Sequence, residues 1–201
     1  DAQLSRGLGD VYKRQQSNRS RNWFSLDWFL YNFKVEHSFN KESNLSFNFF
    51  GLDARRNSIG FRSNRVSQID PLQERDLIKG DFKNFGAEIR WLKSYYLGKK
   101  KSVFLIGSKY YKSNNTSIQG PGSSKSDADF NLYLVDFPNY NQQSNYNYPN
   151  KNVAFFSENI FYLSSKLSFT PGIRFEFIET SSFGEYSKIN TDAAGNVTVS
   201  Y

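Results

Sequence analysis

Apolar and polar side chains alternate along several stretches of this chain, most clearly between Asn152 and Glu179. In its second half one parity is apolar and comprises Leu167, Phe169, Ile173, Phe175 and Phe177. The other parity is polar or small and comprises Ser168, Thr170, Gly172, Arg174 and Glu176. Successive side chains of a strand point to opposite faces, so the pattern predicts a strand with one apolar and one polar face. A tight turn at Ser164–Lys166 joins it to the preceding strand.

The same alternation predicts further strands, which begin near Phe29, Leu45, Asn84 and Val103. Short connections at Asn40–Ser43 and Leu97–Ser102 join them into two more hairpins. Both parities are apolar in Val103–Lys112, so the pattern leaves the faces of that strand unassigned. Val197–Tyr201 is expected to begin one more strand.

Long polar segments separate the hairpins, at Ala54–Gly80, Ser113–Lys151 and Thr180–Asn196. Short and long connections therefore alternate along the chain. Outer-membrane barrels have this asymmetry, with short periplasmic turns and long extracellular loops. Soluble sandwiches vary their loops with less regard to parity, so the pattern favours a barrel. The alternative is a soluble β-sandwich binding module, such as a lectin-like domain, whose apolar faces would form a core.

Composition agrees with strands that have one wet face. Hydrophobic residues make up 38% of the 201-residue chain, and Phe, Trp and Tyr make up 18%. No apolar run reaches the length of a transmembrane helix. The predicted fold class is all-β, a segment of an antiparallel transmembrane β-barrel. About six strands and the start of another are fewer than the eight of the smallest membrane barrels, so we expect a piece of a longer barrel.

Four motifs stand out along the chain: SRNWFSLDW at Ser20–Trp28, FGLDARRNSIGF at Phe50–Phe61, NFGAEIR at Asn84–Arg90 and AFFSENIFYLSSKLSFTPGIRFEFIETSSFGEY at Ala154–Tyr186. They resemble the TonB-dependent outer-membrane receptors, with the closest similarity to the ferric dicitrate receptor-like group of Bacteroidetes-type bacteria. The last motif carries most of the resemblance, which covers about Gln16 to Tyr201. Residues 1–15 fall outside it and are expected to be a non-native or disordered end, so residues 16–201 are expected to form a partial receptor barrel domain.

The resemblance implies an internal part of a barrel of about 22 strands that encloses an N-terminal plug. It implies the outer membrane of a Gram-negative bacterium, and a ferric chelate (ferric citrate or a siderophore) as cargo. The implied partners are outer-membrane lipid, lipopolysaccharide and the TonB complex, which is reached through a plug whose motifs are absent from this sequence. A receptor of the same fold for carbohydrate or cobalamin, and a passive porin without a plug, stay open as alternatives.

Charge and residue usage exclude several other functions. The net charge is +7, but Lys and Arg are scattered and form a run only at Lys99–Lys101, so we expect no nucleic-acid partner. The chain has no Cys, which excludes thiol chemistry, and the single His37 argues against a His-based metal site or triad. We therefore expect no enzyme activity, no catalytic residue, no metal site and no cofactor.

Four arginines are the first candidates for ligand contact. Arg55, Arg56, Arg62 and Arg65 lie in or beside the first long polar segment, at the predicted outer mouth. Guanidinium groups bind carboxylates through two parallel hydrogen bonds, as an anionic chelate would require. The alternative is that outer loops carry Arg for solubility or to meet lipopolysaccharide phosphates.

Further candidates lie in the second long segment and in the last hairpin. Gln119, with Tyr140, Tyr146 and Tyr148, could contact a chelate or a glycan, or form an ordinary Tyr-rich surface loop. Arg174 and Glu176 share the polar face of one strand and are expected to point into the barrel lumen or toward the plug.

Overall fold

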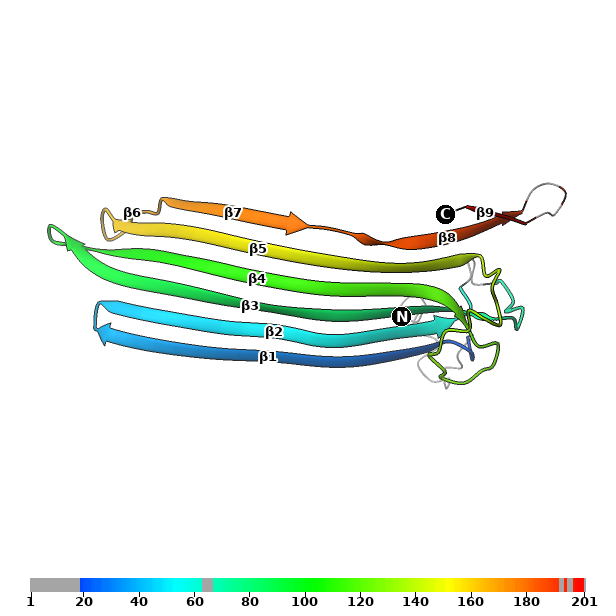
Figure 1. Cartoon of the computed structure of the whole chain (residues 1–201). Helices are drawn as coiled ribbons and strands as arrows, with labels where there is room; N and C mark the ends of the chain where they lie inside the picture. The colour runs from blue at the N-terminus through cyan, green and yellow to red at the C-terminus, as the bar shows by residue number, and fades with distance from the viewer. Residues whose placement is uncertain (1–18, 63–66, 192–193, 195–196, 201) are drawn as a thin grey trace.

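The computed structural model describes residues 19–62, 67–191, 194 and 197–200, and it contains one antiparallel sheet (Figure 1). Five long strands come first: β1 (Trp23–Asn40), β2 (Ser43–Gly60), β3 (Arg75–Leu97), β4 (Lys100–Gly122) and β5 (Gln142–Tyr162). Four shorter ones follow: β6 (Ser168–Phe169), β7 (Gly172–Thr180), β8 (Phe183–Thr191) and β9 (Val197–Ser200). Within the described ranges no helix is long and apolar enough to span a membrane.

The sheet is built almost entirely from neighbours in sequence. Its order is β1-β2-β3-β4-β5-β8-β9, and β6 and β7 also pair with β5. β6, β7 and β8 therefore follow one another along the same edge of β5 and together act as one long strand. The interruption between β6 and β7 falls at Pro171, which has no backbone N–H to give to the ladder; its carbonyl still accepts the Asn159 N–H at 2.9 Å.

The short turns are confirmed, but the polar segments are shorter than predicted. β1 and β2, β3 and β4, and β5 and β6 are joined by residues 41–42, 98–99 and 163–167, and Gly98 has the φ of +63° that its turn requires. The two long loops cover only residues 61–74 and 123–141. Residues 180–196, predicted as a polar excursion, lie mostly in β7 and β8. The strands continue as paired strands through stretches of polar residues. Alternation of apolar and polar side chains does not reveal such stretches.

The register places the alternating apolar residues of β1 to β5 and β7 on one face of the sheet, here called the apolar face. One row across it contains Phe33, Phe49, Ala87, Tyr110, Val153 and Phe177, each opposite the next. This row assigns the faces of the strand that the sequence left open, since Tyr110 belongs to the apolar face. Ring contacts at 5.8–6.3 Å link Tyr31, Phe49, Phe85 and Tyr110 across four strands.

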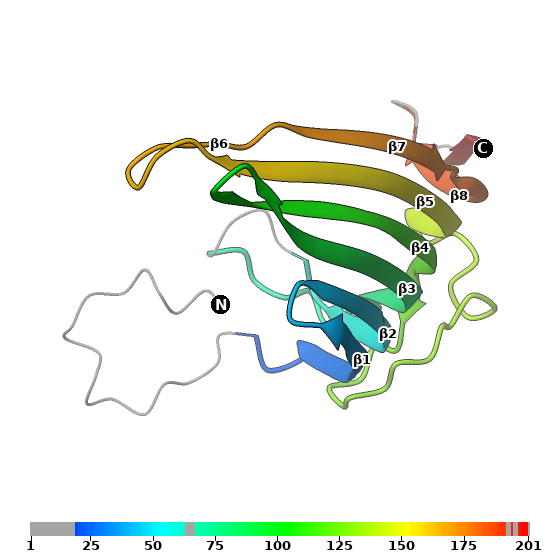
Figure 2. The same ribbon diagram turned by 90° about the vertical axis from the view of Figure 1, so that its left-hand side faces the viewer.

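Nothing among the described residues covers the middle of the apolar face. Phe33 is 62% exposed and Phe177 is 68% exposed, and the sheet is a single curved layer (Figure 2). A sandwich would pack these side chains against a second sheet. The fold is therefore that of a barrel segment, as predicted, and the β-sandwich alternative is wrong.

The opposite, polar face carries charged residues among aromatic rings. The Phe156 ring lies over Gly107, which is opposite it in the ladder, and a Cβ on Gly107 would come within 2.5 Å of the ring. The guanidinium groups of Arg90 and Arg174 lie 5.8 and 5.6 Å from the centre of this ring. The Phe156 ring thus packs on the backbone of Gly107 and interacts with two guanidinium groups, which together hold the ring in place on the polar face.

Candidate functional site

Both long loops lie at one end of the sheet, and two polar clusters tie them there (Figure 1). The clusters begin at consecutive residues of β3, Arg75 and Asp76. Consecutive strand residues point to opposite faces, so Arg75 lies on the apolar side and Asp76 on the polar side. We call the first cluster the rim clamp and the second the mouth cluster.

The rim clamp is centred on Arg75, whose side chain is fully buried. Its Nε donates to the Ser123 carbonyl at 2.9 Å, and its Nη1 donates to the carbonyls of Arg21 and Asp127 at 2.9 and 2.7 Å. Its Nη2 donates to the Ser123 hydroxyl at 3.0 Å. Burial and the nearby charge of Arg21 lower the pKa of Arg75. The partners are mostly backbone carbonyls, which is how a buried guanidinium holds loop conformation.

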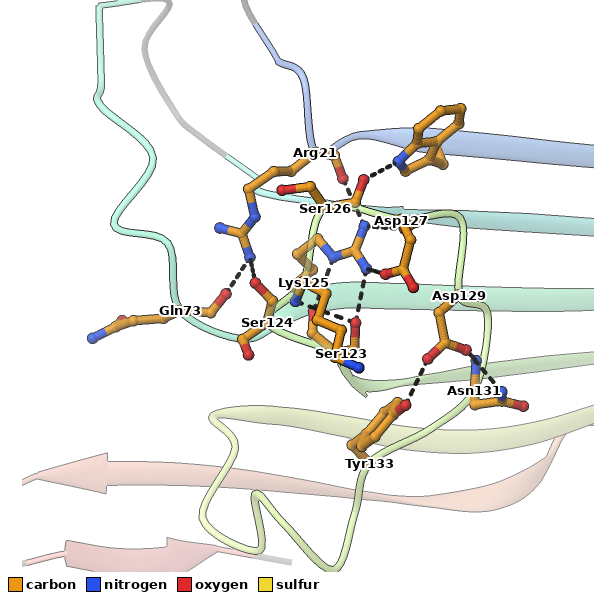
Figure 3. Close-up of polar contacts among 12 residues, drawn as sticks. Arg21, Gln73, Ser123, Ser124, Lys125, Ser126, Asp127, Asp129, Asn131 and Tyr133 are labelled. Atoms are coloured by element: carbon orange, nitrogen blue, oxygen red, sulfur yellow. Dashed lines mark hydrogen bonds and ion pairs between the residues drawn. The ribbon is translucent and has the colours of Figure 1, made fainter.

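Arg21 extends the rim clamp to the other loop (Figure 3). Its Nη1 pairs with Asp70 at 2.7 Å, while its Nη2 donates to the carbonyls of Gln73 and Ser124 at 2.5 and 2.8 Å. Arg21 therefore joins loop 61–74 to loop 123–141. The indole of Trp23 donates to the Ser126 carbonyl at 2.7 Å and so also holds loop 123–141.

The middle of loop 123–141 has its own internal support (Figure 3). The Tyr133 hydroxyl donates to Asp129 Oδ2 at 2.6 Å, and the backbone N–H and side-chain amide of Asn131 donate to Asp129 Oδ1. The Tyr133 hydrogen bond lowers the pKa of Asp129, and the same bond raises the pKa of Tyr133. The loop is thus ordered from within as well as by the rim clamp.

The mouth cluster is centred on the carboxylate of Asp76, of which only 5% is exposed. Arg62 Nη1 donates to its Oδ2 at 2.9 Å, and the Tyr140 hydroxyl donates to its Oδ1 at 2.9 Å. Gln119 Nε2 lies 3.0 and 3.2 Å from its two oxygens and 3.2 Å from Gln142 Oε1. Three side-chain donors from two loop ends and β4 thus converge on one carboxylate.

A cavity of about 350 Å³ adjoins this carboxylate on the polar side. Its lining includes Arg62, Glu74, Asp76, Tyr140 and Gln142. Burial, together with the charge of Asp76, raises the pKa of Tyr140 far above its ordinary value, so the phenol stays protonated and donates. The cavity is a polar recess at the loop end whose wall contains guanidinium, phenol and amide groups.

Of the predicted ligand residues, Arg62 and Gln119 are brought together here, and Tyr140 joins them. Gln119 lies on β4 rather than in a loop, as Tyr146 and Tyr148 lie on β5. Arg65 lies outside the described residues.

Arg55 and Arg56 are not at the mouth, because β2 continues to Gly60 and places both on a strand. Arg55 is on the apolar side, 3.6 Å from Asp81, and Arg56 is on the polar side, 5.6 Å from the centre of the Phe82 ring. The expectation that they lie in or beside a long loop is therefore wrong.

Arg174 and Glu176 share the polar face, as the alternation predicted. Arg174 Nη2 lies 2.8 Å from Glu176 Oε1, which also accepts a hydrogen bond from Asn152 Nδ2 at 3.0 Å. Their partners are on the central part of β5, away from the mouth cluster. Contact with a plug stays a prediction.

Sequence reasoning missed Arg21, Arg75 and Asp76. All three lie where the apolar pattern stops, so no periodicity distinguished them from other polar residues. An available signal was the charged run Glu74–Asp76 directly before the apolar residues Leu77 and Ile78, in which Arg75 and Asp76 begin the strand. Such a pair at a strand start places opposite charges on opposite faces.

Comparisons with known proteins give a structural match but no match in sequence. No family model matches the chain, and no curated protein matches it. Among solved structures, the chain is similar to the ferric citrate transporter FecA in its unliganded form, with a TM-score of 0.61 and 13% identity. The match covers 92% of this chain.

The chain spans only 24% of the length of that transporter. At 13% identity the likeness shows the fold alone, and it agrees with the antiparallel barrel segment predicted from the alternation. The sheet described above is therefore a section of a barrel wall. The receptor family and the bacterial group expected from the motifs stay predictions.

Proposed function

We propose that this chain forms part of the barrel wall of a TonB-dependent outer-membrane receptor that takes up ferric chelates. The observation that carries the proposal is the mouth cluster, where Arg62, Gln119 and Tyr140 direct donors at a carboxylate beside a polar cavity. Ferric citrate and many siderophores present carboxylate or similar anionic oxygens, which such donors bind. FecA, whose fold the chain shares, is a ferric citrate transporter.

The exposed apolar face supports placement in a membrane. Its middle is lined by Phe, Ile and Tyr side chains, and an aromatic row crosses four strands. Facing lipid removes this surface from water, and barrels carry such a band with aromatic girdles. With the short turns on the periplasmic side, loops 61–74 and 123–141 are extracellular, and Arg174 and Glu176 face the lumen and plug.

The proposal is tested with the full-length protein that contains this chain. A deletion strain should lose growth on ferric citrate as sole iron source, and the intact gene should restore growth and uptake of labelled iron. Carbohydrate and cobalamin uptake are measured in the same strains, because a receptor for either would lose that uptake instead. Unchanged uptake of ferric citrate and other ferric chelates in the deletion strain would refute the iron assignment.

We further propose that lipopolysaccharide phosphates meet the apolar face at its loop-side border. Lys112 and Lys151 are directly opposite each other there and both are exposed. Like charges directly opposite destabilise a sheet unless an anion lies between them, and in this row only Glu179, opposite Lys151, offsets them. Replacement of both lysines by Gln should reduce the lipopolysaccharide that copurifies, whereas Lys34→Gln on the polar face should not.

A further inference from the structure

The three donors of the mouth cluster are already occupied, and their acceptor is part of the protein. Asp76 accepts from Arg62, Gln119 and Tyr140 at 2.9–3.2 Å. An anionic ligand that used these donors would therefore have to displace the Asp76 carboxylate. The site has the chemistry to bind a carboxylate and also carries one of its own.

Arg62 is the member of the cluster that can change partners. Its side chain is 59% exposed, whereas the Asp76 side chain is only 5% exposed. Within the described part of the chain only its Nη1 makes a hydrogen bond, so Nε and Nη2 have donors to spare. If Arg62 turns toward an external anion, Asp76 loses its ion pair but keeps hydrogen bonds from Gln119 and Tyr140, so its oxygens are not left without donors.

The charges around the cavity oppose an external anion in the resting arrangement. Glu74 and Asp76 both line the cavity, while Arg62 is the cation in its lining. A carboxylate ligand therefore meets two negative charges and one positive charge that is already paired. An anion in the cavity therefore competes with Asp76 for the positive charge of Arg62.

We propose that Asp76 is an internal competitor, a carboxylate that holds Arg62 until an anionic cargo displaces it. Arg62 lies at the start of loop 61–74, Asp76 lies just after its end, and Tyr140 lies at the end of loop 123–141. The exchange of one carboxylate for another thus releases the contact between Arg62 and Asp76, while Tyr140 stays bonded to Asp76. This inference rests on the proposed uptake of an anionic chelate.

The test compares Asp76→Asn with wild type in the full-length receptor, using ferric citrate as the ligand. Asn has the same shape and can still bind Tyr140 and Gln119, but it removes the competing charge. Because Arg62 is no longer held by a competing carboxylate, ferric citrate binding is expected to tighten by about tenfold, on the order of one charge-assisted hydrogen bond. The matched control is Asp81→Asn, which removes the same charge from the apolar side of the same strand.

A double substitution shows whether the effect acts through Arg62. In an Arg62→Ala background, Asp76→Asn should change ferric citrate affinity by much less than tenfold, because no Arg62 remains to be released. An equal gain in both backgrounds, or weaker binding by Asp76→Asn alone, would overturn the competitor role. A gain in Asp81→Asn as large as in Asp76→Asn would assign the effect to net charge and would overturn it as well.

A second variant keeps the test decisive if Asp76→Asn does not reach the membrane. Asp76→Ser removes the same carboxylate with a smaller side chain that keeps a hydroxyl as a hydrogen-bond partner. It should tighten ferric citrate binding by about three- to fivefold; unchanged or weaker binding would contradict the inference. If wild type itself binds no ferric chelate, the proposed function fails, which is a separate result from a failure of the competitor role.

Discussion

The rim clamp and the mouth cluster lie back to back on the same strand end but hold their partners in different ways. Arg75 is buried and donates mainly to backbone carbonyls, which cannot leave without unfolding the loop. The mouth cluster joins side chain to side chain, and its arginine is more than half exposed. The difference suggests a division of roles, in which one cluster fixes the loops and the other exchanges partners.

The largest effect is expected from Arg75→Leu, which breaks the rim clamp. Three carbonyls and the Ser123 hydroxyl would lose their buried donor, at a cost of roughly 3–5 kcal/mol to the local stability of the loop end. Amide hydrogen exchange in loop 123–141 should speed up accordingly. Arg55→Leu, which removes an exposed arginine from β2, should leave exchange in that loop unchanged.

Arg62→Ala should affect binding rather than folding. Loss of a charged donor at the mouth should weaken ferric citrate binding by about tenfold, while thermal unfolding shifts little because Asp76 keeps its hydrogen bonds from Gln119 and Tyr140. Titration of the full-length receptor and a melting curve separate the two effects. A large drop in melting temperature would show that Arg62 stabilises the fold, as Arg75 does in the rim clamp. The two clusters would then not differ in role.

Tyr140 makes the mouth cluster sensitive to alkali. Its pKa is raised in the fold, so the folded state holds the phenol proton more tightly than the unfolded state. The resulting stabilisation is present below the ordinary tyrosine pKa of about 10 and is lost as pH rises above it. Hydrogen exchange at Tyr140 and its neighbours should therefore speed up above about pH 10. In Tyr140→Phe that extra acceleration should be absent.

The smallest effect is expected from Asp127→Ala in the rim clamp. Its carboxylate is 61% exposed and 3.5 Å from Arg75, whereas its carbonyl accepts from Arg75 at 2.7 Å. Exposed ion pairs contribute little, so the loop end should lose less than about 0.5 kcal/mol. A loss close to that of Arg75→Leu would show that the clamp depends on side-chain charge and not on backbone acceptors.

The fold could be predicted where one face of the sheet is apolar, and not where both faces of a strand are polar. Alternation located the hairpins around Phe33, Phe85 and Phe175, because the apolar and polar faces of the sheet differ there. It failed from Arg55 to Gly60 and from Ser113 to Gly122, because strands in water pair through the backbone whatever side chains they carry.

The candidate site was partly predictable for a related reason. Arg62 and Gln119 were found because their chemistry suits anionic ligands. Asp76 was missed because its role depends on register: Ile78 pairs with Gln119, so Asp76 and Gln119 lie diagonally on the same face. A single sequence without the register does not contain that neighbourhood.

The length of the strands has a consequence for how cargo is met. β3 has 23 residues, whereas a tilted strand crosses the hydrocarbon layer with about 9–11. With the bilayer at the apolar band, as proposed above, about ten of these residues stand on the loop side and raise the mouth some 20–25 Å above the lipid. The Debye length in physiological salt is about 8 Å, so the negative charge of the membrane surface is screened at that height. At that height the loop end of the sheet can bind an anion that the negative charge of the membrane surface would repel at shorter range.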